Sequence, residues 1–145
     1  MNKAYTEAAQ QVIETIPLVM RIVTAEIWRA NSPLVPAQLA ALDVLCQQPC
    51  NLSELAQLNA VSLPTMSGTI SKMVQHGYVQ RTRSQRDRRQ VILEITPKGQ
   101  ALLDQLKERL IAKVSELLGH VSEIDLGNLV AGIEILNQTF SPDER

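Results

Sequence analysis

Aromatic residues and cysteines are scarce in this sequence. Four of the 145 residues are aromatic, so leucine, isoleucine, valine and alanine must supply most of the hydrophobic core. The two cysteines, Cys46 and Cys50, are too few for a disulfide framework, and a reducing compartment would keep them as thiols. Together with His76 and His120 they lack the spacing of a structural zinc site, so we expect neither a metal nor a cofactor.

Long hydrophobic runs are also missing. No segment approaches the roughly 18 uninterrupted apolar residues that a membrane span requires, and residues 1–20 carry two acids without the pattern of a secretory signal. The chain is 45% hydrophobic and 20% charged, which is ordinary for a soluble globular protein. We therefore expect a cytoplasmic protein without membrane contact.

The side-chain groupings of catalytic sites are absent as well. The sequence has no paired carboxylates, no nucleophile beside a base and no glycine-rich phosphate loop. We therefore do not expect an enzyme.

Positive charge is concentrated in the middle of the chain. Between residues 61 and 90 there are six basic residues and one acid, although the whole chain has a net charge of −1. Five arginines fall within residues 81–89, and the β-branched segment VILEIT follows at once. A basic middle between acidic flanks attracts a polyanion locally while the flanks favour solubility.

Hydrophobic periodicity predicts a mainly α fold with a small β-hairpin wing. The expected helices are 6–29, 37–47, a short helix capped by Asn51, a helix at 62–76 capped by Ser62, a helix at 97–118 capped by Thr96, and 123–139. Gly77 is expected to end the helix at 62–76. Strands at 78–83 and 91–96 enclose a polar loop.

This order of elements predicts a winged helix-turn-helix core with dimerisation helices at both ends. The third and fourth helices form the helix-turn-helix, and residues 35–96 form the winged helix-turn-helix DNA-binding region. Residues 1–34 and 97–145 carry apolar stripes that need a partner, so we assign them to a helical dimerisation region.

The arginine-rich loop suits contact with double-stranded DNA. Arginine is planar, permanently charged and able to fork onto phosphate, and a narrow minor groove attracts it. The wing residues expected to contribute are Arg83, Arg86, Asp87, Arg88 and Arg89. Asp87 would orient Arg89 through an ion pair, since a lone acid among arginines otherwise weakens DNA binding.

The helix at 62–76 is the expected recognition helix, the second helix of the motif, which lies in the major groove. The residues expected to meet DNA are small, hydroxylic or cationic: Ser62, Leu63, Pro64, Thr65, Ser67, Gly68, Ser71 and Lys72. The ordinary alternatives are that the hydroxyls only cap and decorate a surface helix and that the arginines form a solvated loop.

The sequence resembles the MarR family (multiple antibiotic resistance regulators). The resemblance covers nearly the whole chain and is most specific in LSELAQLNAVSLPTMSGTISKMVQHGYVQRTR and DRRQVILEITPKG. The family's wing pattern, Asp-x-Arg followed by a strand and a helix opening Pro-x-Gly, matches Asp87, Arg89, Thr96, Pro97 and Gly99, with Ile95 in place of the usual leucine.

This resemblance implies a homodimeric regulator, usually a repressor, that binds a palindromic operator. Arg89, steered by Asp87, would enter the minor groove, and Arg86 and Arg88 would touch phosphates. Many relatives have an arginine where this chain has Gly68, so a base or phosphate contact is lost and helix propensity falls by about 1 kcal/mol relative to alanine.

The resemblance also implies release by a small lipophilic or phenolic effector bound between the dimerisation helices and the DNA-binding lobe. Trp28 is a candidate wall of that cleft, although packing in the core is its more ordinary role. Packing roles are expected for Cys46, which lies on an apolar helix face, and for Cys50. The first helix lacks the cysteine through which some relatives sense peroxide.

One alternative function stays open. A winged helix can serve as a protein-interaction module without specific DNA binding, and the wing arginines would then bind an acidic partner.

Overall fold

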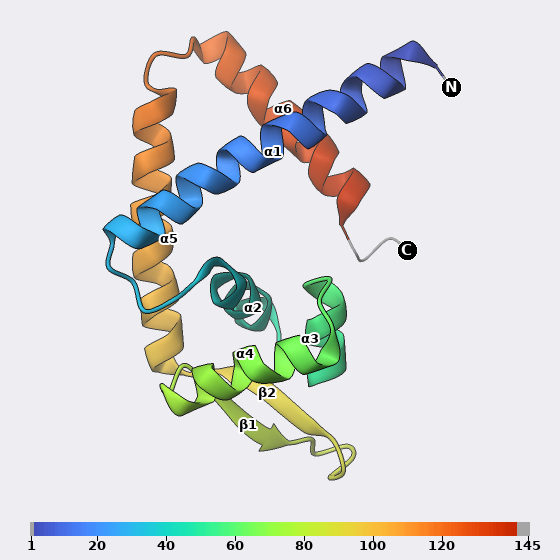
Figure 1. Ribbon diagram of the computed structural model, residues 1–145, viewed down its shortest axis with the longest axis vertical. Coiled ribbons are helices and arrows are strands. Elements are labelled where there is room, and N and C mark those ends of the chain that lie inside the picture. Colours follow the sequence, from blue (N-terminus) through green and yellow to red (C-terminus); the bar gives the residue numbers. More distant parts are fainter. Residues whose placement is uncertain (1, 142–145) are drawn as a thin grey trace. The chain divides into compact units, whose positions relative to one another are not determined.

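The computed structural model describes residues 2–141 and contains every element predicted from the sequence (Figure 1). The elements are α1 Lys3–Arg29, α2 Pro36–Gln47, α3 Leu52–Leu58, α4 Leu63–Gln75, β1 Val79–Arg83, β2 Val91–Ile95, α5 Pro97–Leu118 and α6 Glu123–Phe140. The prediction of a mainly helical protein with a hairpin wing is confirmed. The largest difference is that α1 begins at Lys3 rather than at residue 6.

The chain divides into two compact units at the boundary between Leu110 and Ile111. The first unit holds α1 to α4, the wing and the first part of α5, and the second holds the rest of α5 and α6. None of the helices described in residues 2–141 has the length and apolar character needed to cross a membrane.

The core of the first unit is aliphatic, as the scarcity of aromatic residues predicts. The largest fully buried side chains come from α2, α3, α4, β1 and α5: Leu42, Leu55, Ile70, Met73, Val79 and Leu103. Ile27 of α1 and Leu106 of α5 also belong to this core. The winged helix therefore draws buried residues from both sides of the predicted 35–96 region.

Local caps fix the two helices of the helix-turn-helix. Asn51 and Glu54 form a reciprocal capping box at the start of α3, at 2.9 and 3.1 Å. The Ser62 hydroxyl accepts a hydrogen bond from the Thr65 backbone at 3.2 Å and so caps α4. These bonds explain why the predicted starts of both helices are correct.

The same left-handed turn ends α3 and α4. Val61 N–H donates to the Ala56 carbonyl across Ala60, and Tyr78 N–H donates to the Met73 carbonyl across Gly77. Gly77 has a φ of +79° and Ala60 a φ of +52°. Glycine adopts this region without steric cost, whereas alanine does not, so only the turn at Gly77 could be recognised in the sequence.

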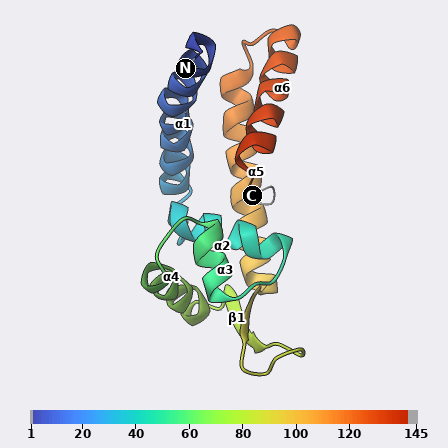
Figure 2. The ribbon, with the colours of Figure 1, turned by 90° about the vertical axis from the view of Figure 1, so that its right-hand side faces the viewer.

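The wing is an antiparallel hairpin in which Val79 pairs with Ile95 and Arg83 with Val91. In Figure 2 the loop between the strands extends beyond the helices of the winged-helix region. Cys50 adds an isolated antiparallel bridge to Leu93, the middle residue of β2. This bridge connects the hairpin to the segment between α2 and α3.

The joint between the hairpin and α5 is tightly packed around Gly99. A Cβ atom at this position would lie 2.2 Å from the Tyr78 carbonyl oxygen, so only glycine fits without movement of the backbone. The Thr96 hydroxyl accepts from Gly99 N–H at 3.1 Å, as expected for the cap of α5. This joint fixes where the wing leaves the core.

The second unit has an unburied apolar surface on α6. The helix is capped by Ser122, whose hydroxyl accepts from Asp125 N–H at 3.1 Å. None of its residues is buried, and its exposed large apolar side chains are Ile124, Leu129, Val130, Ile133, Ile135 and Phe140. Apolar surface on this scale calls for a partner.

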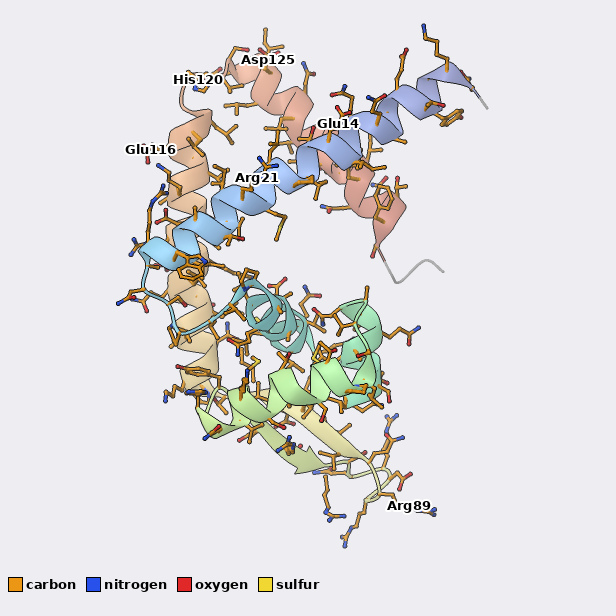
Figure 3. All side chains as sticks on the ribbon, in the orientation of Figure 1. Glu14, Arg21, Arg89, Glu116, His120 and Asp125 are labelled. Atoms are coloured by element: carbon orange, nitrogen blue, oxygen red, sulfur yellow. The ribbon has the colours of Figure 1, made fainter. Side chains whose placement is uncertain are left out.

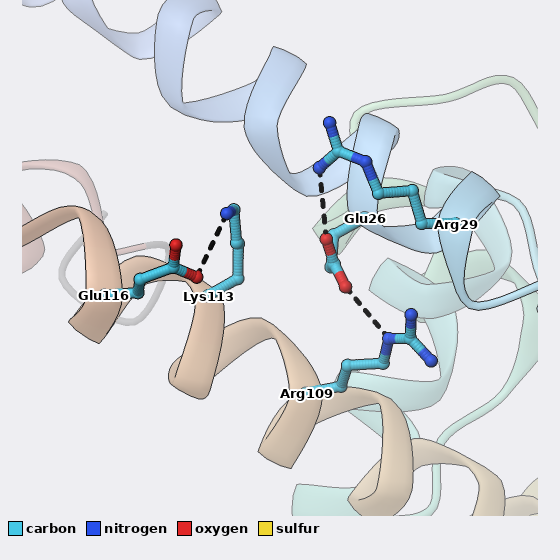
Figure 4. A network of polar contacts seen from close by, with 5 residues as sticks. All are labelled: Glu26, Arg29, Arg109, Lys113 and Glu116. Atoms are coloured by element: carbon cyan, nitrogen blue, oxygen red, sulfur yellow. Dashed lines mark hydrogen bonds and ion pairs between the residues drawn. The ribbon is translucent and has the colours of Figure 1, made fainter.

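One buried acid connects α1 to α5 (Figure 4). The Glu26 side chain is 8% exposed and accepts from Arg109 Nε at 2.9 Å and from Arg29 Nη1 at 3.3 Å. The hydrogen bond from Arg109 is the main reason that the pKa of Glu26 lies below its ordinary value of 4.5. Sequence periodicity had not indicated a buried carboxylate on α1.

We predict that Glu26→Gln lowers the thermal midpoint of unfolding at pH 7, because both arginines lose their charged partner. The folded state holds the lowered pKa, so the ion pair stabilises the protein above the ordinary glutamate pKa. That contribution is lost as the pH falls through the lowered value. The midpoints of wild type and variant should therefore converge on acidification.

Glu7→Gln removes an exposed ion pair with Lys3 and should leave the midpoint nearly unchanged. Equal effects of the two substitutions would refute this role for Glu26.

Candidate nucleic-acid interface

Helix α4 has one buried face and one exposed face. Met66, Ile70 and Met73 are buried in the core. At 100° per residue, Gly68 lies opposite these three side chains. The predicted contact residues on α4 that are exposed are Ser62, Leu63, Pro64, Thr65, Gly68, Ser71 and Lys72. Ser67 departs from the prediction because it is half-buried beside the inward face.

Several hydroxyl groups on α4 are engaged in hydrogen bonds within the protein. Ser62 Oγ donates to Thr65 Oγ1 at 2.8 Å, and Thr69 Oγ1 donates to the Thr65 carbonyl at 3.1 Å. The capping role considered from the sequence therefore holds for Ser62. Lys72 and Gln75 are the longer polar side chains of the exposed face.

Arg81 connects the wing to α4. Its Nη2 donates to Ser71 Oγ at 3.4 Å, between residues on β1 and α4. Val79 is buried and precedes Arg81 by two positions on β1, so both side chains lie on the same side of the strand. This alternation directs the Arg81 side chain toward α4. The wing and the exposed face of α4 are thus parts of one surface in the first unit.

The wing tip is organised by its own hydrogen bonds. The Ser84 hydroxyl accepts from the backbone N–H of Arg86 at 3.2 Å. Arg83 Nη1 donates to the Arg88 carbonyl at 2.9 Å, which brings the two ends of the loop together. Arg86, Arg88 and Arg89 are all exposed on this loop. Their charge is therefore presented on an ordered turn.

Asp87 and Arg89 are in contact at the tip, where Figure 3 labels Arg89. Asp87 Oδ1 accepts from Arg89 N–H at 3.0 Å and lies 3.8 Å from Arg89 Nε. The Arg89 side chain is 95% exposed. The contact anticipated from the sequence is present, and it leaves most of the guanidinium open to solvent.

Two residues of this surface were missed in the prediction of contact residues. Gln75 is exposed one helical turn beyond Ser71, and Arg81 makes the contact with that serine. The period of α4 would have indicated Gln75, because it lies on the same side as Gly68. The direction of Arg81 follows only from the strand register.

Cys46 contradicts its predicted packing role, whereas Cys50 agrees with the packing role expected for it. Cys46 is exposed, and Cys50 is buried with 4% of its surface accessible. Leu45 is the neighbour that faces the core, and adjacent helical positions diverge by 100°. Burial raises the pKa of the Cys50 thiol. Within residues 2–141, no three His, Cys, Asp or Glu side chains gather as metal ligands would.

Trp28 does not pack in the core. It is 78% exposed at the end of α1, so the expectation of a core role is wrong. A cavity of about 220 Å³ lies nearby in the first unit, between residues 30–33 and α5. Its lining includes Leu102, Gln105, Leu106 and Arg109 but not Trp28.

Comparison with known proteins supports the class indicated by this geometry. A helix-turn-helix with a basic hairpin defines a winged helix-turn-helix protein, and the MarR family model matches residues 32–90. The HTH-type transcriptional repressor NicR of Pseudomonas putida is 31% identical over 96 residues, which are 66% of this chain. The match spans 59% of the length of NicR.

Solved structures share the fold over almost the whole chain. The transcriptional regulator BldR of Sulfolobus solfataricus is 27% identical with a TM-score of 0.71, and the alignment covers 95% of this chain and 99% of BldR. RV1404 of Mycobacterium tuberculosis is 18% identical with a TM-score of 0.85 and full coverage of both chains. Over residues 32–90 the chain matches the MarR family, and NicR, the relative described above, is a transcriptional repressor. This similarity to regulators agrees with the expectation that the chain is not an enzyme.

The exposure of the two thiols gives a direct test of the packing around α2. A small alkylating reagent should modify Cys46 rapidly in the native protein, because this thiol is exposed. Cys50 should react only when the protein unfolds, since it is buried and its pKa is raised. Mass spectrometry of the alkylated peptides measures both rates. Cys46→Ser should abolish the fast phase, and labelling of Cys50 at the same rate would contradict the structure.

Proposed function

We propose that this protein is a homodimeric, sequence-specific DNA-binding regulator that acts as a repressor on a palindromic operator. The observation that carries the proposal is the surface formed by the exposed face of α4 and the wing, which Arg81 and Ser71 connect. α4 has the position of a recognition helix, and the wing arginines supply positive charge beside it. The name of NicR as a repressor favours repression over activation.

The charge of the interface supports a nucleic acid over an acidic protein. The wing arginines are exposed around a turn that holds them apart, and only one acid lies among them. Arginines spaced along a projecting hairpin suit the regularly spaced phosphates and the minor groove of a duplex. An acidic protein partner stays the alternative, and absence of DNA binding at low salt would favour it.

The wing supplies the first test. Arg89→Ala should weaken duplex binding by about 1–3 kcal/mol and reduce the slope of log K against log salt by about 1, because one cationic contact is lost. Fluorescence anisotropy with DNA from upstream of the protein's own gene, at several salt concentrations, measures both. Lys3→Ala removes an equal charge far from the wing in sequence and should change neither quantity.

Asp87→Asn distinguishes two roles of Asp87, namely the orientation of Arg89 and the reduction of the positive charge of the wing. The substitution makes the wing more positive by one unit, so simple attraction would strengthen DNA binding. If Asp87 positions Arg89, binding should instead weaken toward the level of Arg89→Ala, because the group that lies 3.8 Å from Arg89 Nε loses its charge. The backbone hydrogen bond from Arg89 N–H can remain, since the asparagine oxygen still accepts. Stronger binding by Asp87→Asn would remove the positioning role while leaving the wing in the interface.

Apolar side chains on α1 support dimerisation through the terminal helices. Ile13, Ile16, Val19 and Met20 are between 46% and 71% exposed, and α6 carries a comparable set in the second unit. Burial of such surface against a second copy stabilises at about 25 cal/mol per Å². Similarity to the family also implies dimers.

Ile16→Asp should dissociate the dimer, because burial of an unpaired carboxylate costs several kcal/mol. Analytical ultracentrifugation across a concentration series should give a much weaker dimerisation constant, while circular dichroism reports retained helix. Gln11→Asp places the same charge on another side of α1 and should leave the dimer intact. An unchanged constant for Ile16→Asp would place the dimer contact elsewhere.

The cavity beside α5 is a candidate effector site in the first unit. Its volume of about 220 Å³ suits a single-ring ligand, and its lining combines leucines with Gln105 and Arg109. Arg109 would favour an anion such as a phenolate or a benzoate. Trp28, the wall expected from the sequence, does not line this cavity but lies close to it in the chain.

Gln105→Trp should block this cavity by filling its mouth. Calorimetric titration with a panel of benzoates and phenols should give heat with the wild type and none with the variant. Glu108→Trp, outside the lining, should bind as the wild type does. A ligand that binds both variants equally would occupy another site.

A further inference from the structure

The centre of the exposed face of α4 is a glycine that the fold does not need. Gly68 lies opposite the buried Met66, Ile70 and Met73, and a Cβ atom at this position would meet nothing within 4 Å. Glycine in the interior of a helix weakens it relative to alanine. Packing within the protein therefore gives no reason for the absence of a side chain here, and this absence leaves the helix backbone open to close approach by a ligand.

Two hydroxyls near Gly68 already use their protons within the protein. Ser62 Oγ donates to Thr65 Oγ1, and Thr69 Oγ1 donates to the Thr65 carbonyl. Thr65 and Ser71 accept from Ser62 and Arg81 and keep their own hydroxyl donors.

The first turn of α4 also offers apolar groups. Leu63 is 48% exposed, and Pro64 is exposed beside it. Neither side chain has a polar atom that could bind a base edge. The apolar feature of the major groove is the C5-methyl group of thymine.

We propose that α4 recognises thymine methyl groups in each half-site of its operator. Leu63 and Pro64 contact the methyl groups, and Gly68 allows the helix backbone to come close to the floor of the groove. This inference rests on the proposed function and adds the chemistry of its specificity. The wing arginines supply affinity through phosphates, which carry no direct sequence information, so discrimination falls to α4.

Deoxyuridine tests the methyl contacts because it lacks only the C5-methyl group of thymidine. A tight-binding duplex is first selected from a random-sequence library with the wild-type dimer. Each thymidine of the selected site is then replaced in turn by deoxyuridine. Thymines beneath α4 should lose about fourfold in affinity per methyl group, as expected for one buried carbon. Thymines outside the half-sites should lose nothing.

Two variants test which residue causes the preference for thymidine over deoxyuridine. Leu63→Ala should reduce the preference for thymidine over deoxyuridine, because the apolar contact is shortened. Arg89→Ala should weaken both duplexes equally and preserve their ratio, since deoxyuridine leaves the phosphates and the minor groove unchanged. A preference that is unaffected by Leu63→Ala would overturn the assignment to this residue.

Gly68→Ala tests whether the backbone of α4 comes close to the DNA, because it should change protein stability and DNA affinity in opposite directions. The thermal midpoint should rise, because alanine favours the helix and its methyl group has room. Affinity for the selected duplex should nevertheless fall by tenfold or more, on the order of a misfit base contact. Gly127→Ala on α6, where a Cβ atom also meets nothing within 4 Å, should raise the midpoint. At concentrations where sedimentation shows that this variant is dimeric, its DNA affinity should equal that of the wild type.

The outcomes distinguish this inference from the proposed function. If no duplex is enriched, sequence-specific DNA binding itself fails. If a duplex is enriched but has no thymine in its half-sites, or binds equally with deoxyuridine throughout, methyl recognition is overturned and the regulator stands. Unchanged affinity of Gly68→Ala would overturn the close approach.

Discussion

The packing of one side of α4 into the aliphatic core is the constraint on which the candidate interface depends. Met66, Ile70 and Met73 occupy positions that bring them onto one face, and their burial turns Gly68 outward. Rotation of the helix by a single residue would expose a methionine and bury a polar side chain. Large-to-small changes at such buried positions cost about 2–5 kcal/mol, so the orientation is strongly specified. The buried side chains of α4 therefore determine which residues the helix presents to a ligand.

The wing depends on the same core by a different route. β1 begins at the buried Val79 directly after α4, and β2 leads through Thr96 into α5. Gly99 allows the backbone of α5 to approach the Tyr78 carbonyl. With the strands held in this way, the loop at residues 84–90 can carry three arginines although it contains no apolar side chain. Their mutual repulsion is offset in part by Asp87 and by the carbonyl of Arg88.

Much of this fold was predictable because the signals that begin its helices are local. Asn51, Ser62 and Thr96 cap helices through bonds to the residue three positions further along the chain, so the local sequence contains both partners. The features that the prediction missed or got wrong depend on distant contacts. The orientation of Cys46, the exposure of Trp28 and the burial of Glu26 are decided by which neighbouring element covers each position. The partner of Arg81 likewise required the register of the hairpin.

The solvent exposure of Trp28 has a practical consequence. It is the single tryptophan of the chain, so the indole emission of the native protein comes from one known position at the end of α1. The side chain is two residues from Glu26 and immediately precedes Arg29, the partner of that acid. The protein therefore carries a built-in optical probe at the joint between α1 and α5. Quenching of the Trp28 fluorescence by iodide or acrylamide would show whether a ligand or a partner covers the contact between α1 and α5, without any added label.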